Sequence, residues 1–592
     1  MRHRPPGLEF VKLKNILIKP DVERRSPHLM VTILLIFLLG FRYGFPSSSS
    51  EPPRNRPTVG LVLSGGGARG FAHIGVLKLL EENRVPVDYV GGASMGALIG
   101  AMYSMGKTPE EIESFVAGLD WDLLLQPSVS FENLSFRRKE DRRNIPSPIF
   151  LTGDIKDLKL PNALISGQEI EILFDQLTLP YALVDDFDDL PIPYRAVGTD
   201  MVKGSSITLA KGSLSRALRA TMSIPGIFAP VEIDGRILSD GGLVNNIPTN
   251  VVKEMGADIL IAVNIETRLE DRDSLDSLPG ILAQTINIAT LENSLRSLRQ
   301  ADLIIAPDLG KYTLADFADS REIIKLGYEG ARRKASLLQS LSLDEEAWRR
   351  HLAERRKRRK EAPPPVPVFL NVAGADANAT RTIREKLGDS YTGKPLDQAA
   401  QERLAEDLAD LKGTGRFESL AFGLIEENGR TGLLIRQNRT ASQAAAPTLL
   451  ELGLDVNSVK SDKVNFDFLA RMTLFDTGAY GVEWRNDLRL GSNPLLATEY
   501  YRPLGKSGLF ISPQASFERR RTNYFVNGDN LAEYIGQTLQ TGIDLGYSIN
   551  AKSELRAGYA VGYQKYLRQI GDPLLGNTEG IVSRAGLSWV YD

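Results

Sequence analysis

The pattern of hydrophobic and polar positions changes its period several times along the chain. Thr58–Leu63 (TVGLVL) is a short apolar run of the kind found in strands that are buried on both faces. In Phe71–Glu82 the apolar residues recur at helical spacing instead. Asp88–Ala93 is again a short strand, and an apolar helix begins at Ala97. This alternation of strands and helices predicts an α/β domain with parallel strands.

A second unit, residues 366–440, is predicted to follow the order strand, helix, helix, strand, strand. Its expected strands are Val366–Val372, Phe417–Glu426 and Gly432–Gln437, and its expected helices are Thr380–Leu387 and Asp397–Lys412. Asn428-Gly429 lies between the last two strands and is a strong hairpin signal.

From Thr448 onward the period becomes two. Apolar residues such as Trp484, Leu488 and Leu490 alternate with charged ones, and Gly, Asn and Asp turns separate the segments. A soluble β-sandwich and a transmembrane β-barrel both give this alternation, and aromatic residues near the segment ends fit the barrel. This segment alone favours neither of the two. Together with the export signal expected at residues 1–50 and the unit at 366–440, the region 448–592 is expected to be an antiparallel transmembrane barrel.

The N-terminal region resembles an export signal. Leu29–Phe41 is an apolar run of signal-peptide length behind several Lys and Arg residues, and Ser47–Ser50 follow it. Residues 1–50 are therefore expected to be a signal peptide with a polar leader. An uncleaved anchor or a buried helix is the alternative.

A basic run, Arg349–Lys360, is followed by Pro363-Pro364-Pro365. Residues 340–365 are expected to be a solvated helix end and a stiff linker. Contact with anionic lipid headgroups is the alternative.

Composition excludes several classes of function. A net charge of −3 argues against nucleic acid as a partner. The absence of cysteine excludes disulfides, thiolate metal sites and a cysteine nucleophile. With four histidines in the chain, a histidine-rich metal site is not expected, and we expect no metal and no cofactor.

A glycine loop follows the first strand. Ser64–Gly70 contains Gly65, Gly67 and Gly70, which fit G-x-G-x-x-G, although the ribose-binding acid of a dinucleotide site is not convincing. The same loop at a helix N-terminus presents N–H groups to any anion, including an oxyanion.

The second motif is Gly92-Ala93-Ser94-Met95-Gly96, between a predicted strand and a predicted helix. G-x-S-x-G in this context is typical of a nucleophile, because the glycines allow a cramped strand-to-helix turn that exposes the serine. A simple glycine-serine turn is the alternative for Ser94.

A serine nucleophile needs a base. His73 is the histidine inside this domain, and its place in the first helix indicates a structural role. A carboxylate is the better candidate. Asp234-Gly235 is expected to join two strands, and the second strand ends in Asp240-Gly241-Gly242. Asp240 is the candidate base, and a second Asp-Gly turn is the alternative.

These three motifs, in this order, resemble the patatin-like phospholipases over residues 58–335. The resemblance implies a three-layer α/β/α hydrolase with a catalytic dyad of Ser94 as nucleophile and Asp240 as proton acceptor. The glycine loop would supply or position the oxyanion donors, and the flanking glycines would support the two motifs. The loop residues are Gly65, Gly66, Gly67, Arg69 and Gly70, and the supporting glycines are Gly92, Gly96, Gly241 and Gly242.

Residues 366–440 are similar to a POTRA domain, and the whole chain resembles the patatin-type (type Vd) autotransporters. The barrel would be incomplete, since 448–592 has fewer strands than the barrels that it resembles. The resemblance implies an exported phospholipase A or lysophospholipase in a bacterial outer membrane, with its hydrolase domain periplasmic, surface-displayed or secreted.

The expected partners are a phospholipid substrate, outer-membrane lipid and the outer-membrane assembly machinery. A homodimer through Ile281–Leu298 is a further expectation. The alternative function is an outer-membrane assembly or secretion factor with a non-catalytic patatin-like domain.

Overall fold

The computed structural model describes residues 56–591 apart from short stretches at 127–130, 146–148, 161–162, 266–268, 270–271, 361–362, 439–447, 461–462, 480, 506, 528, 551–552 and 572. The expected signal peptide, residues 1–50, lies outside this range.

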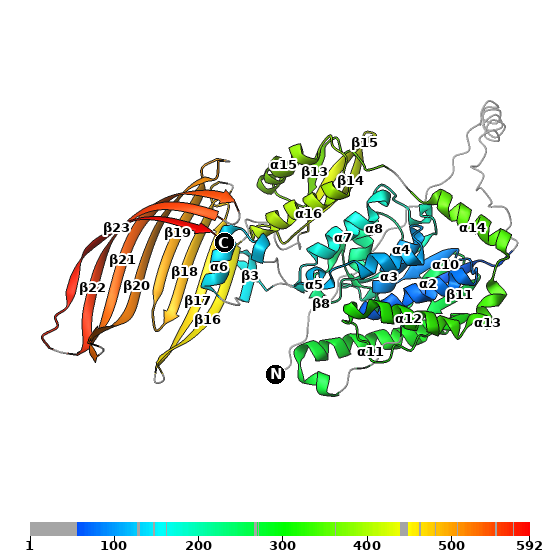
Figure 1. Cartoon of the computed structure of the whole chain (residues 1–592), viewed down its shortest axis with the longest axis horizontal. Coiled ribbons are helices and arrows are strands. Elements are labelled where there is room, and N and C mark those ends of the chain that lie inside the picture. The colour runs from blue at the N-terminus through cyan, green and yellow to red at the C-terminus, as the bar shows by residue number, and fades with distance from the viewer. Residues whose placement is uncertain are drawn as a thin grey trace, which may run out of the picture. The chain divides into compact units, whose positions relative to one another are not determined.

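An eight-stranded sheet forms the centre of the first region (Figure 1). Its order is β12-β11-β1-β2-β6-β10-β9, with β7 paired to β6. The parallel strands are β1 (Val59–Leu63), β2 (Tyr89–Gly92), β6 (Tyr194–Asp200), β11 (Ile259–Val263) and β12 (Leu303–Ile305). The antiparallel strands are β7 (Ser205–Leu209), β9 (Val231–Ile233) and β10 (Arg236–Asp240).

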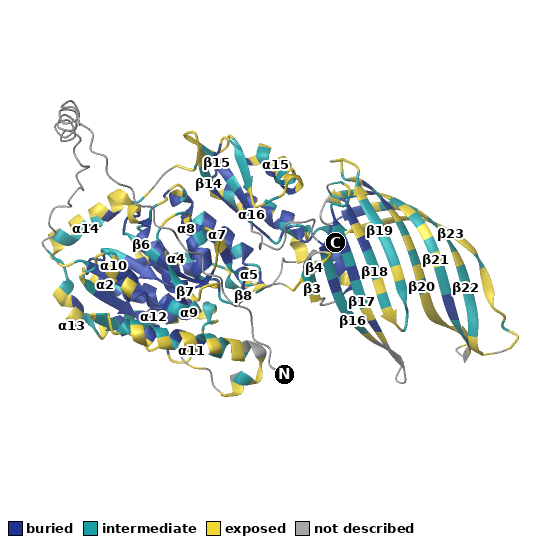
Figure 2. Ribbon diagram, turned by 180° about the vertical axis from the view of Figure 1, so that it is seen from behind, coloured by how far each residue is buried: buried dark blue, intermediate teal, exposed yellow. Residues whose placement is uncertain are grey.

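Both faces of this sheet are covered by apolar clusters, and its interior is buried in Figure 2. Leu61 and Leu63 of β1 belong to a cluster on one face, and Val62 belongs to a cluster on the other. The α/β architecture expected for this region is therefore confirmed. Its helices are α2 (Ala72–Glu82), α3 (Ser94–Ser104), α4 (Pro109–Ala117), α5 (Trp121–Leu124), α7 (Gln168–Thr178), α8 (Leu214–Thr221), α9 (Gly242–Asn245), α10 (Thr249–Glu254), α11 (Leu278–Leu298), α12 (Ser320–Arg332) and α13 (Ala335–Leu338).

The basic run lies on α14 (Glu345–Arg358). Several of its members depart from the expectation of a solvated run, since Arg358 donates to the carbonyl of Asp188 at 2.8 Å and Arg359 pairs with Glu111 at 2.9 Å. Arg355 is buried, its Nη1 lies 2.7 Å from Glu81 Oε1, and its guanidinium stacks on Tyr103 at 3.9 Å. A charge run does not reveal which of its members have partners distant in sequence.

The second region has the predicted order of elements. It consists of β13 (Leu370–Ala373), α15 (Ala377–Tyr391), α16 (Gln398–Gly413), β14 (Ser419–Glu427) and β15 (Arg430–Asn438). Asn428 and Gly429 both have positive φ, as the predicted hairpin turn requires.

The C-terminal region is one antiparallel sheet of ten strands, in which β16 to β23 follow one another in chain order. These strands are β16 (Thr448–Lys460), β17 (Lys463–Phe475), β18 (Glu483–Gly491), β19 (Leu495–Pro503), β20 (Leu509–Val526), β21 (Asp529–Asn550), β22 (Ser553–Gly571) and β23 (Thr578–Tyr591). The sheet is open within the described residues, because its two end strands do not pair with each other.

The other two strands of this sheet come from much earlier in the chain. β3 (Ile149–Asp154) pairs with β16, and β4 (Asp157–Lys159) pairs with β3. The helix before them, α6 (Phe136–Asn144), makes buried ion pairs with the sheet. Arg137 Nε and Arg138 Nη2 lie 2.8 and 2.6 Å from Glu483 Oε2. The sequence pattern does not predict this insertion.

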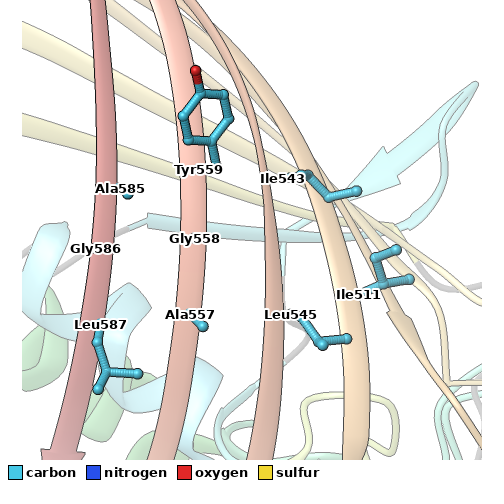
Figure 3. Close-up of a pocket in the computed structure, with 9 residues that line it drawn as sticks. All are labelled: Ile511, Ile543, Leu545, Ala557, Gly558, Tyr559, Ala585, Gly586 and Leu587. Atoms are coloured by element: carbon cyan, nitrogen blue, oxygen red, sulfur yellow. The ribbon is translucent and has the colours of Figure 1, made fainter.

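The two faces of the sheet differ in polarity. Trp484 is exposed, whereas its neighbours Glu483 and Arg485 are buried. Strands β20 to β23 also present a shallow apolar hollow (Figure 3). It is lined by Ile511, Ile543, Leu545, Ala557, Gly558, Tyr559, Ala585, Gly586 and Leu587. Among the described helices, none has both the length and the apolar character that a membrane span requires.

Candidate active site

Ser94 lies at the junction of β2 and α3, where the chain turns sharply. Its φ is +50°, an unusual backbone conformation for a residue with a side chain, and its N–H donates to Thr221 Oγ1 at 3.0 Å. The helix begins at Ser94 rather than at Ala97, as the sequence pattern had suggested. Backbone strain held by surrounding contacts is typical of the nucleophile elbow.

The glycines beside Ser94 are required by close approach of the backbone. A Cβ on Gly96 would lie 2.4 Å from the carbonyl oxygen of Ser64. A Cβ on Gly92 would lie 2.7 Å from the nitrogen of Ala97. A larger residue in place of Gly96 would push α3 away from the end of β1. A larger residue in place of Gly92 would push α3 away from β2, the strand that precedes it.

Asp240 is the last residue of β10 and is buried. Its N–H donates to the carbonyl of Ser223 at 2.9 Å, its carbonyl accepts from Thr199 Oγ1 at 2.8 Å, and its Oδ1 accepts from the N–H of Gly242 at 2.8 Å. A Cβ on Gly241 would lie 2.3 Å from the carbonyl oxygen of Val197, so only glycine lets the chain turn here. Asp234, by contrast, occupies the hairpin turn expected for it, with φ +51°.

Burial raises the pKa of Asp240 to about 6. The Ser94 hydroxyl and the Gly242 N–H act in the opposite direction and lower this pKa. Asp240 Oδ2 accepts no hydrogen bond from any residue that the structure describes. The carboxylate is therefore a stronger proton acceptor than an exposed aspartate, with one oxygen available to accept.

The glycine loop lies directly beside the serine, since a Cβ on Gly65 would be 3.0 Å from Ser94 Cβ. The Gly65 N–H donates to Asn246 Oδ1 at 3.0 Å, so that donor is already engaged. Within the described residues, no acceptor pairs with the N–H of Gly66 or of Gly67. These two groups are the loop donors that could meet a negative oxygen.

The remaining loop residues support this arrangement. Gly67 has φ +54°, and a Cβ there would lie 2.5 Å from the carbonyl oxygen of Leu314. Arg69 is buried, and Gly70 packs against Met95, the residue after Ser94.

His73 is fully buried, and its Nε2 lies 2.8 Å from the carbonyl oxygen of Ser64. Burial lowers the pKa of His73 to about 4, so the ring is neutral at neutral pH. Its observed hydrogen bond is to the backbone at the end of β1. No group of side chains in the described part of the chain has the composition of a metal site.

Asn246 is a site residue that the sequence motifs did not indicate. Its Oδ1 accepts from Gly65, its Nδ2 donates to Ser294 Oγ at 3.2 Å, and its N–H donates to Asn293 Oδ1 at 2.8 Å. It therefore joins the glycine loop to the segment that follows Asp240. The signal in the sequence that could have pointed to Asn246 is its position shortly after Asp240-Gly241-Gly242.

Comparison with known proteins is consistent with this geometry. Residues 61–253 match the family model described as patatin-like phospholipase. An uncharacterized NTE family protein of Mycobacterium tuberculosis is 32% identical over 234 residues, which cover 39% of this chain and 55% of that protein. The patatin-like phospholipase domain-containing protein 7 of Mus musculus is 29% identical over 304 residues, covering 46% of this chain and 20% of that protein.

The chain spans about half the length of the bacterial relatives and about a fifth of the mouse one. Among solved structures, VipD from Legionella pneumophila has 16% identity and a TM-score of 0.30, covering 60% of this chain and 80% of that chain. BamA from Haemophilus ducreyi has 15% identity and a TM-score of 0.28, covering 38% and 44%. Similarity at this level does not assign a fold.

Residues 61–253 are therefore similar to the patatin-like phospholipases.

Proposed function

We propose that this protein is a lipid acyl hydrolase that cleaves fatty-acyl esters of glycerophospholipids through a Ser94–Asp240 dyad. The observation that carries the proposal is the strained turn at Ser94 next to a buried carboxylate of raised pKa. The family match of the surrounding domain supports the same class of substrate.

The chemistry follows from the groups present. Asp240 accepts the hydroxyl proton of Ser94 while Oγ attacks the ester carbonyl, and the N–H groups of Gly66 and Gly67 stabilise the oxyanion. As the intermediate collapses, protonated Asp240 returns the proton to the departing alcohol, which leaves an acyl-serine. Water, deprotonated by Asp240, then releases the fatty acid and restores Ser94.

The C-terminal sheet suggests where this reaction takes place. Exposed apolar residues alternate with buried charged ones, the reverse of a sheet in water. This alternation is typical of strands that face lipid. We propose that the sheet belongs to an outer-membrane barrel, with residues 366–440 as a POTRA-like unit, as in patatin-type autotransporters. Outer-membrane lipid and the assembly machinery would then be partners.

The direct test is fatty-acid release from phospholipid vesicles by the full chain, with the Ser94→Ala variant as the blank. Fatty-acid release by the parent protein and not by the Ser94→Ala variant supports the hydrolase function. If folded parent protein releases no fatty acid, the hydrolase proposal is wrong, and an assembly factor with a non-catalytic patatin-like domain becomes the leading function.

The raised pKa of Asp240 predicts the pH profile. The base works as the carboxylate, so kcat/KM should rise with pH up to about 6 and then level off. One unit below that pKa the rate should be about tenfold lower. Initial rates between pH 4.5 and 8 on a soluble short-chain ester measure this directly, and a flat profile would contradict Asp240 as the base.

Asn246→Ala should lower kcat by roughly 10- to 100-fold with a small change in KM, because the glycine loop loses an acceptor that fixes its position. Asn246→Asp keeps an oxygen acceptor for the Gly65 N–H and should recover part of the rate. Steady-state kinetics of both variants test this positioning role. Equal loss in the two variants would count against it.

A further inference from the structure

Helix α11 has an inverted polarity. The side chains that it buries against the domain include Asn287, Thr290 and Ser294, all polar. A helix on the surface of a soluble domain normally buries its apolar stripe instead.

The polar side is fixed by hydrogen bonds to the segment that follows Asp240. Asn293 Nδ2 donates to the carbonyl of Gly242 at 2.9 Å, and Thr290 Oγ1 donates to the same carbonyl at 3.3 Å. Ser294 Oγ accepts from Asn246 Nδ2. Turning α11 to bury its apolar residues would break these bonds, so its orientation is set by the active site.

The outward side of α11 carries an apolar stripe. Ile281, Ile288 and Leu295 are 50%, 55% and 54% exposed, and their spacing of seven places them on one side of the helix. Leu282, 37% exposed, lies against Gly226 at the edge of the stripe. Figure 2 shows the exposed residues along α11. Apolar surface left in water costs about 25 cal/mol of free energy per Å². A partner or a bilayer that buries the stripe would therefore be stabilising.

Two properties of the stripe indicate that a lipid surface, rather than a second copy of the chain, buries it. Its four half-exposed side chains offer well under the ~800 Å² that each partner buries in a standard protein interface. The exposed cation Arg299 follows at its C-terminal end, next to Arg296, which pairs with Glu292 at 3.5 Å, and Arg299 suits the phosphates of anionic headgroups. A helix with one apolar side and flanking cations can lie in the plane of a bilayer interface.

We propose that α11 seats the hydrolase on the bilayer that holds its substrate, through Ile281, Leu282, Ile288 and Leu295. This proposal rests on the proposed lipid acyl hydrolase function. Because the polar side of the same helix holds α9, the segment that follows Asp240, contact with lipid at the stripe brings the bilayer surface to the catalytic residues. The substrate is thus a lipid within a membrane.

The chain contains no cysteine, which permits a site-specific test. Ile288→Cys and Leu295→Cys, each in a Ser94→Ala background, are labelled with an environment-sensitive fluorophore in the full chain. Leu337→Cys, a similarly exposed leucine on α13, is the matched control. The proteins are reconstituted in phosphatidylethanolamine–phosphatidylglycerol vesicles that contain nitroxide-labelled lipid.

We expect nitroxide quenching of at least threefold at positions 288 and 295 and little at 337. Equal quenching at all three positions, or none at 288 and 295, overturns the proposal. Self-quenching at 288 that rises with protein concentration, without lipid quenching, would show that a second copy covers the stripe. The Ser94→Ala background makes the quenching independent of turnover. Quenching at positions 288 and 295, together with no fatty-acid release by the parent protein, would refute the hydrolase function but not the lipid contact of α11.

The activity of the full chain gives a second test. Ile288→Asp with Leu295→Asp should lower fatty-acid release from vesicles at least tenfold, because two charges would have to enter the interface. Leu337→Asp should change release less than twofold. Similar losses in the two variants would contradict the role of α11.

Discussion

Replacing Ser94 by alanine is expected to lower fatty-acid release by at least about 10⁴-fold. Removing the nucleophile of a serine hydrolase leaves only the contribution of binding and oxyanion stabilisation. The backbone strain at Ser94 does not change, since alanine keeps the Cβ, and the hydroxyl makes none of the backbone bonds that hold the turn. The free energy of unfolding should therefore change by less than about 1 kcal/mol.

Release is measured as free fatty acid from phospholipid vesicles, beside a thermal melt of each variant. Ser104→Ala is the matched control, because Ser104 is a buried serine at the other end of the same helix. It should keep most of the activity. A Ser94→Ala protein that retains a tenth or more of the parental rate would rule out Ser94 as the nucleophile.

Asp240→Asn is expected to remove activity and increase stability at the same time. The amide cannot accept the serine proton, and loss of a base of this kind costs about 10³- to 10⁴-fold in rate. The folded-state pKa of about 6 lies above the usual value for aspartate, so the native state binds a proton more tightly than the unfolded chain. Stability is then lost as the pH rises from about 4 to 6, by up to about 3 kcal/mol.

The neutral amide avoids this penalty and retains an oxygen for the Gly242 N–H. Denaturation at pH 7.5 and at pH 4 measures the effect, with the gain expected only at the higher pH. Asp200→Asn is the control, since Asp200 is a buried carboxylate on the adjacent strand β6 whose Oδ1 accepts two backbone N–H bonds. An Asp240→Asn variant that is destabilised at pH 7.5 would show that the carboxylate has a mainly structural role.

The sequence pattern was sufficient where local periodicity decides the structure. The buried strand was correctly predicted at Thr58–Leu63, since Val59–Leu63 forms β1 and every residue of β1 is buried. The helix after Ser94 was placed three residues late because glycine and serine are poor helix residues, and the elbow overrides their propensity. The order of elements in residues 366–440 followed from periodicity and one Asn-Gly turn.

Contacts distant in sequence could not be predicted in this way. Asn246 acts through Gly65, about 180 residues earlier, and no spacing rule connects them. Arg137 and Arg138 belong to a basic stretch that would be assigned to the surface, whereas both are buried against Glu483. The polarity of α11 is visible in its sequence, but which side faces the domain depends on its hydrogen bonds to α9, the segment that follows Asp240.

The pairing of β3 with β16 has a consequence for how the chain folds. Ile149 and Leu452 are neighbours in the sheet although about 300 residues separate them. Such high contact order slows folding, because the entropy of closing the loop is lost before the pairing compensates for it. During synthesis β3 and β4 must wait for the rest of the chain with an unpaired edge. Until β16 is synthesised, the free edge of this hairpin can pair with the wrong strand.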